Sequence, residues 1–292
     1  MLLEIAIADA YGHGFEYAPP DETRKNDGET HCQHPRHLRL LPGMYTDDAQ
    51  MSMAVAQVVL SGEVSPETFA DAFVDRFKAD PRDGYARGFQ AFLEGVSDGA
   101  DFLARIRPDS EKGGAAMRAG PIGLLPDIER IIAVAELQAR LTHDTVKGRA
   151  SSKAVALMVH HVARRLGPLS ELPAFLSAKA PEIDWTDIHR GKVGQDGDQL
   201  VRAALGVLLD GNSLSDALVR SVSLGGDTDT LAAVVMAVAS VSAEKKRDIH
   251  PKLVNGLENG PFGRDHLKAI DATLAKRFRL PIVSVGPSEE FA

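Results

Sequence analysis

The spacing of apolar residues in this chain of 292 residues is helical almost throughout. Residues 231–238 place four apolar side chains at positions i, i+3, i+4 and i+7 of one helical face. Similar stripes run through 51–59, 67–77, 127–141, 150–166, 199–210 and 265–277. Clear alternation of apolar and polar residues, the pattern of a strand, does not appear. The sequence therefore predicts an all-α fold with a helix in each of these ranges.

The segments between the stripes are short and rich in Gly, Pro and Asp, as in DPRDG at 80–84 and RGKVGQDGD at 190–198. Such segments connect one helix to the next, so we expect a single domain over residues 1–292. The longest irregular stretch is 18–45, and a loop of that length in a compact domain is more often functional than idle. Residues 281–292 are predicted to form a loosely held terminus.

Composition narrows the classes of protein that this chain could belong to. Hydrophobic residues make up 44% and the formal net charge is −8 with no basic run, which argues against a general nucleic-acid binder. Cys32 is the only cysteine, so no intrachain disulfide can form and a reducing compartment is favoured. The N-terminus lacks the basic region of a signal peptide, and no apolar run approaches the roughly 18 residues that cross a bilayer. These features predict a cytoplasmic protein without a membrane partner.

Two of the predicted helices begin with clusters of carboxylates and hydroxyls. Residues 45–53 read YTDDAQMSM, and residues 225–230 read GGDTDT. Helix capping explains part of the pattern, because Thr46 and Asp227 could accept hydrogen bonds from free N–H groups and acids suit the helix dipole. Capping does not require two acids at each start, twice in one chain.

A site for hard metal ions explains the whole pattern. Carboxylate and hydroxyl oxygens without imidazole or thiolate select Mg²⁺, Mn²⁺ or Ca²⁺ over Zn²⁺ or Cu²⁺. Four converging carboxylates would repel one another, and two divalent ions roughly 3.5–4 Å apart would balance that charge. Gly225 and Gly226 allow the backbone to approach closely at the second cluster. The residues thus predict a two-metal cleft between the two helix starts.

Five segments follow one another in the order of a known family. GMYTDDAQM at 43–51 resembles its Thr-Asp-Asp-Thr motif, and LGGDTDTLAA at 224–233 resembles its second metal motif. IADAYGHGFE at 7–16, GGAAMRAGPIGLL at 113–125 and LTHDT at 141–145 are similar to its opening Gly-Asp-Ala stretch, its Asn-Gly-x-Ala-Met-Arg loop and its Thr-His segment. From about residue 5 to 260 the chain resembles the ADP-ribosylglycohydrolases, the relatives of dinitrogenase reductase-activating glycohydrolase.

The resemblance implies an all-α domain whose cleft holds two Mg²⁺ or Mn²⁺ ions and hydrolyses the glycosidic bond between ADP-ribose and a modified acceptor. The metal ligands that it implies are Thr46, Asp47, Asp48, Asp227, Asp229 and Thr230. The catalytic residues that it implies are Glu16, Asp48 and Asp83. The residues that it implies for binding ADP-ribose are Gly113, Gly114, Ala115, Ala116, Met117 and His143.

Several of these residues have a local alternative. Glu16 could be a surface acid in a glycine-flanked loop, and Asp83 could cap the helix that follows it. Residues 113–117 could form a turn before an apolar segment instead of a loop whose N–H groups meet the diphosphate. Arg118 could hold this loop by hydrogen bonds or meet a phosphate. His143 is predicted to be a structural or pocket-edge residue and not a metal ligand.

The chain departs from the family pattern at three positions. Ala49 replaces the second Thr of the first motif, Gly113 stands where the family has Asn, and Ala8 replaces the Gly before Asp9. These changes leave the acceptor open. ADP-ribosyl-arginine on protein is the simplest substrate, and serine, threonine, a nucleobase or a small metabolite are the alternatives. A catalytically weak module that binds ADP-ribose is the other class of function.

One loop holds donors of a different kind. The segment THCQHPRH contains His31, Cys32, His34 and His37, whose side chains suit borderline metals. Their spacings do not match a zinc finger, and no second pair follows nearby. The segment predicts either a transition-metal site or a polar loop over the cleft.

Overall fold

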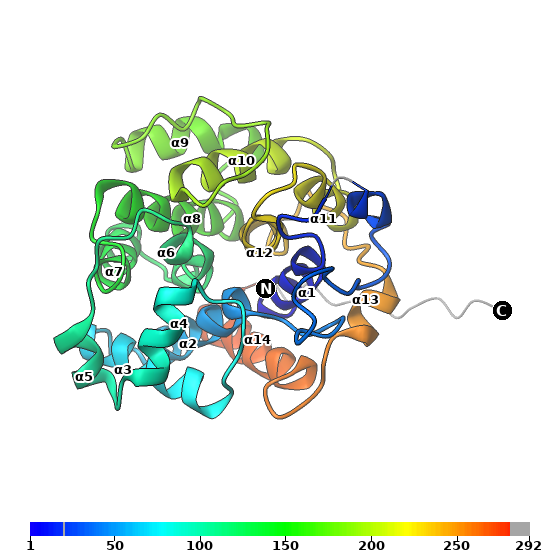
Figure 1. Cartoon of the computed structure of the whole chain (residues 1–292). Coiled ribbons are helices and arrows are strands. Elements are labelled where there is room, and N and C mark those ends of the chain that lie inside the picture. Colours follow the sequence, from blue (N-terminus) through cyan, green and yellow to red (C-terminus); the bar gives the residue numbers. More distant parts are fainter. Residues whose placement is uncertain (20, 281–292) are drawn as a thin grey trace.

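The computed structural model describes residues 1–19 and 21–280, so the terminus predicted at 281–292 lies outside it. The described part of the chain is built from helices and contains no β-sheet, only isolated bridges between loops (Figure 1). The predicted all-α fold is confirmed. Within these residues no helix combines the length and the apolar character needed to span a bilayer.

Each predicted stripe forms a helix. These helices are α2 (Asp47–Ser61), α3 (Pro66–Ala79), α7 (Ile128–Arg140), α8 (Val146–Ala163), α10 (Gly197–Leu209), α12 (Thr228–Ala239) and α14 (Arg264–Phe278). Local caps fix several of the starts, because Ser65, Asp127 and Thr145 accept a hydrogen bond from a first-turn backbone N–H group.

Further helices form where no stripe was predicted. They are α1 (Leu2–His13), α4 (Arg87–Gly95), α5 (Gly99–Arg105), α6 (Gly114–Met117), α9 (Leu172–Lys179), α11 (Leu214–Ser223) and α13 (Pro251–Gly256). Three 3-10 turns, η1 (Glu22–Lys25), η2 (Gly120–Leu124) and η3 (Leu169–Glu171), complete the elements. The irregular stretch predicted at 18–45 contains only η1 and turns in its described part.

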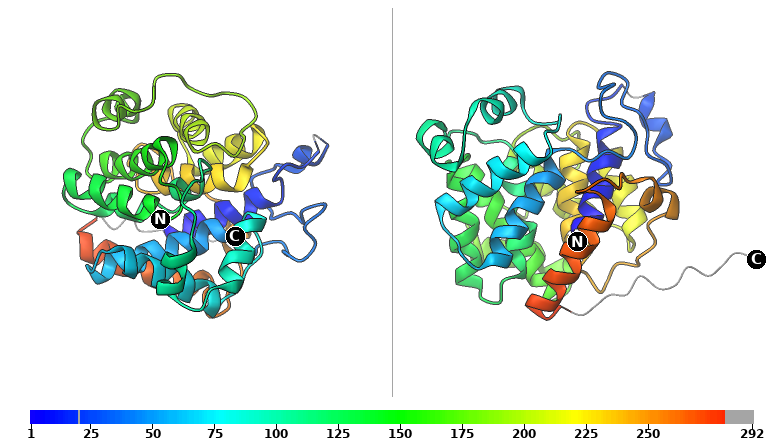
Figure 2. Two further views of the ribbon diagram at one scale, coloured as in Figure 1. Left: turned by 60° about the vertical axis from the view of Figure 1, so that its left-hand side comes forward. Right: turned by 90° about the horizontal axis from the view of Figure 1, so that it is seen from below.

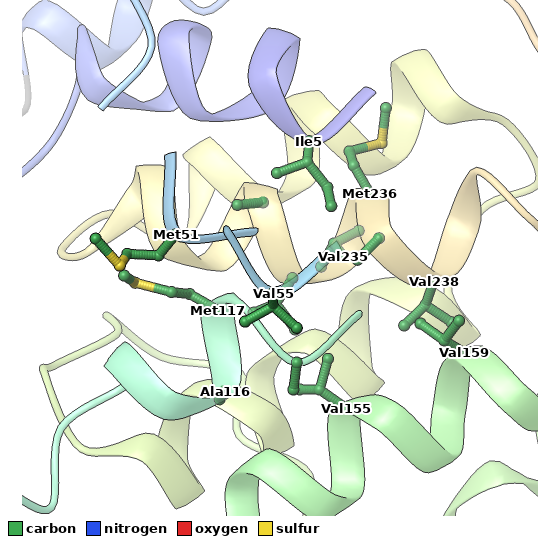
Figure 3. Close-up of a cluster of buried hydrophobic side chains, with 14 of the residues drawn as sticks. Ile5, Met51, Val55, Ala116, Met117, Val155, Val159, Val235, Met236 and Val238 are labelled. Atoms are coloured by element: carbon green, nitrogen blue, oxygen red, sulfur yellow. The ribbon is translucent and has the colours of Figure 1, made fainter. Parts of the chain in front are cut away.

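Helix α12 forms the centre of the core. Every residue of α12 is buried, and the helix packs against α1, α8, α10 and α11 (Figure 1). Figure 3 shows Val235 and Met236 of α12 among side chains from other helices, including Ile5 of α1, Val55 of α2 and Val155 of α8. Because α12 is enclosed on all sides, its first turn is held rigidly at the end of the core.

The opening helix α1 is also enclosed. It lies between α12 and α14, and Figure 2 shows α1 and α14 side by side. The backbone N–H groups of Leu2 and Leu3 donate to the Asp271 carboxylate of α14 at 2.8 and 3.0 Å. A carboxylate from another helix therefore satisfies donors that the start of α1 leaves free.

Truncating the centre of this core should destabilise the protein strongly. Met236 is fully buried, and Met236→Ala should lower the free energy of unfolding by about 2–5 kcal/mol. Leu166→Ala is the control, because 48% of Leu166 is exposed and its loss should change stability by no more than about 0.5 kcal/mol. Urea unfolding followed by circular dichroism measures both, and equal losses would contradict the central place of α12.

Candidate functional site

The starts of α2 and α12 face one cleft of about 1340 Å³. Most of the predicted site residues line it, namely Glu16, Asp47, Asp48, Asp83, Gly113, Gly114, Met117, His143, Asp227, Asp229 and Thr230. Thr46, Ala115 and Ala116 are fully buried and are not part of the lining. The fold therefore brings together segments separated by up to about 200 residues of sequence.

The start of α2 is held by Asp9 of α1, for which the sequence predicted no role of its own. The Asp9 carboxylate is fully buried and accepts hydrogen bonds from the Thr46 and Ala49 backbone N–H groups, each at 2.9 Å. It also accepts from the Thr46 hydroxyl at 2.7 Å. The Thr46 side chain makes no capping bond of its own. Asp9 thus caps α2 from another helix and leaves Asp47 and Asp48 free to face the cleft.

The start of α12 is positioned by close backbone contacts. Gly226 has φ +91°, and a side chain there would collide with the Val193 backbone. A Cβ at Gly12 would lie 2.6 Å from Asp229 Cα, so only glycine lets the end of α1 come this close. The Thr228 hydroxyl donates to the Gly12 carbonyl at 2.8 Å. Asp227 occupies the N-cap position without a capping bond from its side chain. Capping therefore accounts for neither acidic start.

The carboxylates of the cleft crowd one another. Burial, reinforced by the neighbouring carboxylates, raises the pKa of Asp47 to about 7 and the pKa values of Asp48 and Asp227 well above their usual range. Burial opposes ionisation of Asp229 too, but the hydrogen bond and charge of His13 lower its pKa. Asp48 Oδ1 is buried and has no hydrogen-bond partner among residues 1–19 and 21–280. A buried carboxylate oxygen that has no partner and lies among other carboxylates needs a positive charge nearby.

Glu16 belongs to this cluster. Burial, with Asp229 and Asp227 nearby, raises the pKa of Glu16 to about 10. Its carboxylate can meet those of Asp227 and Asp229 around a single point. The interpretation of Glu16 as an isolated surface acid does not fit this position.

Asp83 lies on the wall of the same cleft. Its carboxylate accepts a hydrogen bond from the Gln90 side chain at 3.1 Å. Helix α4 begins at Arg87 behind Ala86 as its N-cap, and no side chain caps it. The alternative that Asp83 caps the following helix is therefore wrong.

The predicted donors of the 30–37 loop do not converge. His31 bonds to the Leu253 carbonyl at 3.0 Å, the Cys32 thiol to the Thr30 carbonyl at 3.7 Å, and His34 Nε2 to the Glu16 carbonyl at 2.8 Å. His37 alone among the four lines the cleft. The four residues form no shared metal site, and the interpretation as a polar loop over the cleft agrees with the position of His37.

The segment at 113–117 is a short turn of helix, α6. Gly113, Gly114 and Met117 line the cleft, but the N–H groups of Gly113, Ala116 and Met117 already donate to backbone carbonyls. Of the five residues, only Gly114 and Ala115 have N–H groups without a hydrogen-bond partner in the described part of the chain. The prediction that this loop presents its N–H groups to a ligand is thus restricted to two positions.

Arg118 holds this loop in place. Its guanidinium is 1% exposed and donates to the side chains of Gln138 and Thr142, each at 2.7 Å. Gln138 in turn donates to the Ala115 carbonyl at 2.8 Å. Of the two roles predicted for Arg118, the structure bears out the holding of the loop.

His143 stands at the edge of the cleft as predicted. It is 7% exposed, and its Nδ1 lies 2.6 Å from the Thr142 hydroxyl. Burial, followed by the charges of Arg118 and Lys112, lowers the pKa of His143 to about 3. His143 is therefore a neutral imidazole.

The mouth of the cleft carries the opposite charge to its floor. Four exposed basic residues of the lining form no hydrogen bond or ion pair through their side chains within residues 1–19 and 21–280, namely Arg39, Arg87, Arg107 and Lys112. Aromatic surface accompanies them, since Phe89 and Phe92 of α4 also line the cleft. A ligand with anionic groups and a planar ring matches this mouth.

The chain is similar to known proteins along most of its length. A family model described as ADP-ribosylglycohydrolase matches residues 1–283. The ADP-ribosyl-(dinitrogen reductase) glycohydrolase of Rhodospirillum rubrum is 26% identical over 255 residues, which cover 82% of this chain and 83% of that protein. The ADP-ribosylarginine hydrolase Tri1 of Serratia proteamaculans (strain 568) is 22% identical over 259 residues, which cover 82% and 69%. A solved structure, an ADP-ribosylglycohydrolase-related protein complex, shares the fold with TM-score 0.71, 22% identity and coverage of 94% and 95%.

The raised carboxylate pKa values predict how stability depends on pH in the absence of cations. Asp9 and Asp47 titrate near 7 in the folded protein and near 3.8 when unfolded, so the folded state holds protons that the unfolded state has released. The free energy of unfolding should therefore fall as pH rises from about 4 to about 7. Melting temperatures in chelator across this range measure it.

Divalent cations should oppose this loss, because they bind the ionised carboxylates. Mg²⁺ or Mn²⁺ should thus raise the melting temperature more at about pH 8 than at about pH 5. Asp47→Asn, which removes one of the titrating groups, should flatten the pH dependence. A melting temperature in chelator that climbs between pH 4 and 7 would contradict the prediction.

Proposed function

Because this chain belongs to the ADP-ribosylglycohydrolase family and is a hydrolase of that type, we propose that its cleft releases ADP-ribose from arginine side chains of proteins with the help of two Mg²⁺ or Mn²⁺ ions. One observation carries the proposal. Asp47 and Asp48 of α2 meet Asp227 and Asp229 of α12 in a single cleft, with a buried oxygen of Asp48 left unpaired. Neither helix capping nor an ion pair explains why these four carboxylates lie in one cleft.

The residues fit hard divalent cations. The donors at the floor of the cleft are all oxygens, and the raised pKa values of Asp47, Asp48 and Asp227 support a cation that keeps these carboxylates ionised together. The predicted ligands that line the cleft, Asp47, Asp48, Asp227, Asp229 and Thr230, would hold the ions. Thr46 was also predicted, but it does not line the cleft and its hydroxyl donates to Asp9. When bound, divalent cations orient substrate hydroxyls and acidify water for attack on a glycosidic carbon.

The other residues of the cleft act on the substrate. Glu16 and Asp83 stand on the cleft wall, where a carboxyl group can donate a proton to a leaving group or take one from water. Asp48 would join them as a base in addition to holding an ion. Of the residues predicted to bind ADP-ribose, Gly113, Gly114, Met117 and His143 line the cleft and would contact it, whereas Ala115 and Ala116 are buried behind them. His143 is neutral and can therefore accept or donate a hydrogen bond without adding charge.

The mouth of the cleft supports a substrate with a diphosphate. Arg39 and Arg107 line the cleft, and their guanidinium groups have no partner among the residues that the structure describes. Guanidinium forms paired hydrogen bonds with phosphate oxygens. Arginine is proposed as the acceptor because it is the acceptor named for the Tri1 relative. The departures at Ala49 and Gly113 favour testing other acceptors beside it.

A substrate panel tests the reaction. The protein is incubated with ADP-ribose linked to arginine, serine, threonine, a nucleic acid and a small metabolite, with and without Mg²⁺ or Mn²⁺, and free ADP-ribose is measured. We expect release from the arginine conjugate that depends on the cation. Release from a different acceptor would replace arginine, and binding of ADP-ribose without release from any conjugate would make the protein a recognition module.

The substitution Asp229→Asn tests the metal cluster itself. It removes one negative charge at nearly constant size, so hydrolysis should be lost and added Mg²⁺ or Mn²⁺ should raise the melting temperature less than in the wild type. Far-UV circular dichroism should remain helical. Asp127→Asn is the matched control, because Asp127 is exposed and serves as an ordinary cap that accepts from the Arg130 N–H.

An ordinary cap tolerates Asn at a cost of about 1 kcal/mol or less. The Asp127→Asn protein should therefore keep its activity and its response to metal. Wild-type turnover and an unchanged metal response in Asp229→Asn would remove Asp229 from the metal cluster.

A further inference from the structure

A second set of possible ligands lies beside the carboxylate floor and includes two imidazoles. His13 is the last residue of α1, Glu16 follows one turn later, and His37 reaches them from the 30–37 loop. One ligand atom from each residue can be chosen so that all three lie within 4.8 Å of one another. His13 and His37 stack with their ring centroids 5.4 Å apart.

The spacing of these atoms suits tetrahedral coordination. His13 Nδ1 lies 3.6 Å from Glu16 Oε2, and His37 Nδ1 lies 3.9 Å from the same oxygen. Zinc bonds of about 2.0–2.1 Å place neighbouring ligand atoms about 3.4 Å apart in a tetrahedron. The two imidazole nitrogens therefore need to approach Glu16 Oε2 by only a few tenths of an ångström. Asp229 Oδ2, at 3.4 Å from His13 Nδ1, stands beside them as a further oxygen.

The loop that supplies His37 is fixed by a neighbouring histidine. His34 Nδ1 accepts hydrogen bonds from the backbone N–H groups of Arg36 and His37 at 3.1 and 2.9 Å, while its Nε2 donates to the Glu16 carbonyl. The His34 ring also stacks on His37 with centroids 4.1 Å apart. His34 therefore orients His37 toward Glu16. Both of its ring nitrogens are engaged in hydrogen bonds, so His34 is not a ligand itself.

We propose that His13, Glu16 and His37 form a binding site for one borderline transition-metal ion of the Zn²⁺ class, which adjoins the carboxylate floor and shares Glu16 with it. Two imidazoles and a carboxylate prefer Zn²⁺ and Co²⁺, whereas the oxygen-only floor prefers Mg²⁺ and Mn²⁺. An ion at this site ties the loop of residues 30–37 to the end of α1. It thereby fixes one rim of the cleft, on which His37 lies.

This site does not depend on the proposed hydrolysis, and its test measures metal binding. The protein is stripped with chelator, saturated with Mg²⁺ to fill the oxygen-only floor, and titrated with Zn²⁺ by calorimetry and with Co²⁺ by visible absorption. We expect one Zn²⁺ per chain and the absorption bands of tetrahedral Co²⁺ with nitrogen ligands. His37→Ala should weaken Zn²⁺ binding at least about tenfold and abolish those bands.

The variant is suited to the purpose because half of the His37 side chain is exposed, so its loss leaves the core intact. Two controls separate this site from other donors. Cys32→Ser removes the only thiol, and His189→Ala removes an imidazole whose partner is the Lys192 carbonyl of its own loop. Both should bind Zn²⁺ as the wild type does. Equal Zn²⁺ binding by the wild type and His37→Ala, or loss of binding in Cys32→Ser, would overturn the proposal.

Discussion

The mutual repulsion of carboxylates at the starts of α2 and α12 is the constraint around which this structure is organised. The fold keeps Asp48 and Asp229 together in spite of that repulsion by fixing the backbone behind them. Asp9 caps α2 from α1, and Gly12 lets the end of the same helix touch the first turn of α12. One buried helix thus positions both acidic turns. The dipoles of α2 and α12 contribute partial positive charge to the same point, which offsets part of the repulsion but not all of it.

The sequence predicted the helices with an apolar stripe, including the fully buried α12, and α1 and α4 illustrate why others were missed. Helix α3 combines an apolar stripe with the Ser65 capping box, so its range could be read directly. Helix α1 has every residue buried and consequently no polar face to give it a period. The opposite holds for α4, in which Leu93 is the only buried residue. Apolar spacing is clearest where two faces of a helix contrast, and α1 and α4 lack that contrast. Helix α12 is also buried on every face, but its apolar residues at i, i+3, i+4 and i+7 still fit the helical pattern.

Most residues of the candidate site could be predicted from the sequence, but their individual roles could not. The pairs of acids at the starts of α2 and α12 could be identified in the sequence, because neither helix capping nor solubility explains them. The buried cap provided by Asp9 has no local signature, since its partners lie 37 and 40 residues away. The contact between His13 and Asp229 has no local signature either, because only the packing of α1 on α12 brings the two residues together. The prediction of a metal site within the 30–37 loop failed for the same reason. His31 and Cys32 are close to His37 in sequence, but in the fold they bond to different partners.

The separation of charge within the cleft links its two halves. Without cations, the carboxylates of the floor repel an anion that the arginines of the mouth attract, so a diphosphate can be held at the rim while the rest of the ligand is kept out. Two divalent cations on the floor would neutralise its four carboxylates, so the same ligand would no longer be repelled there. The ligand must strengthen the binding of the cations to the same degree, because coupling between two binding sites is reciprocal. A cleft with an acidic floor and a basic mouth is therefore built to fill both parts together, and Glu16, which contacts the cluster from the wall, lies where the two parts meet.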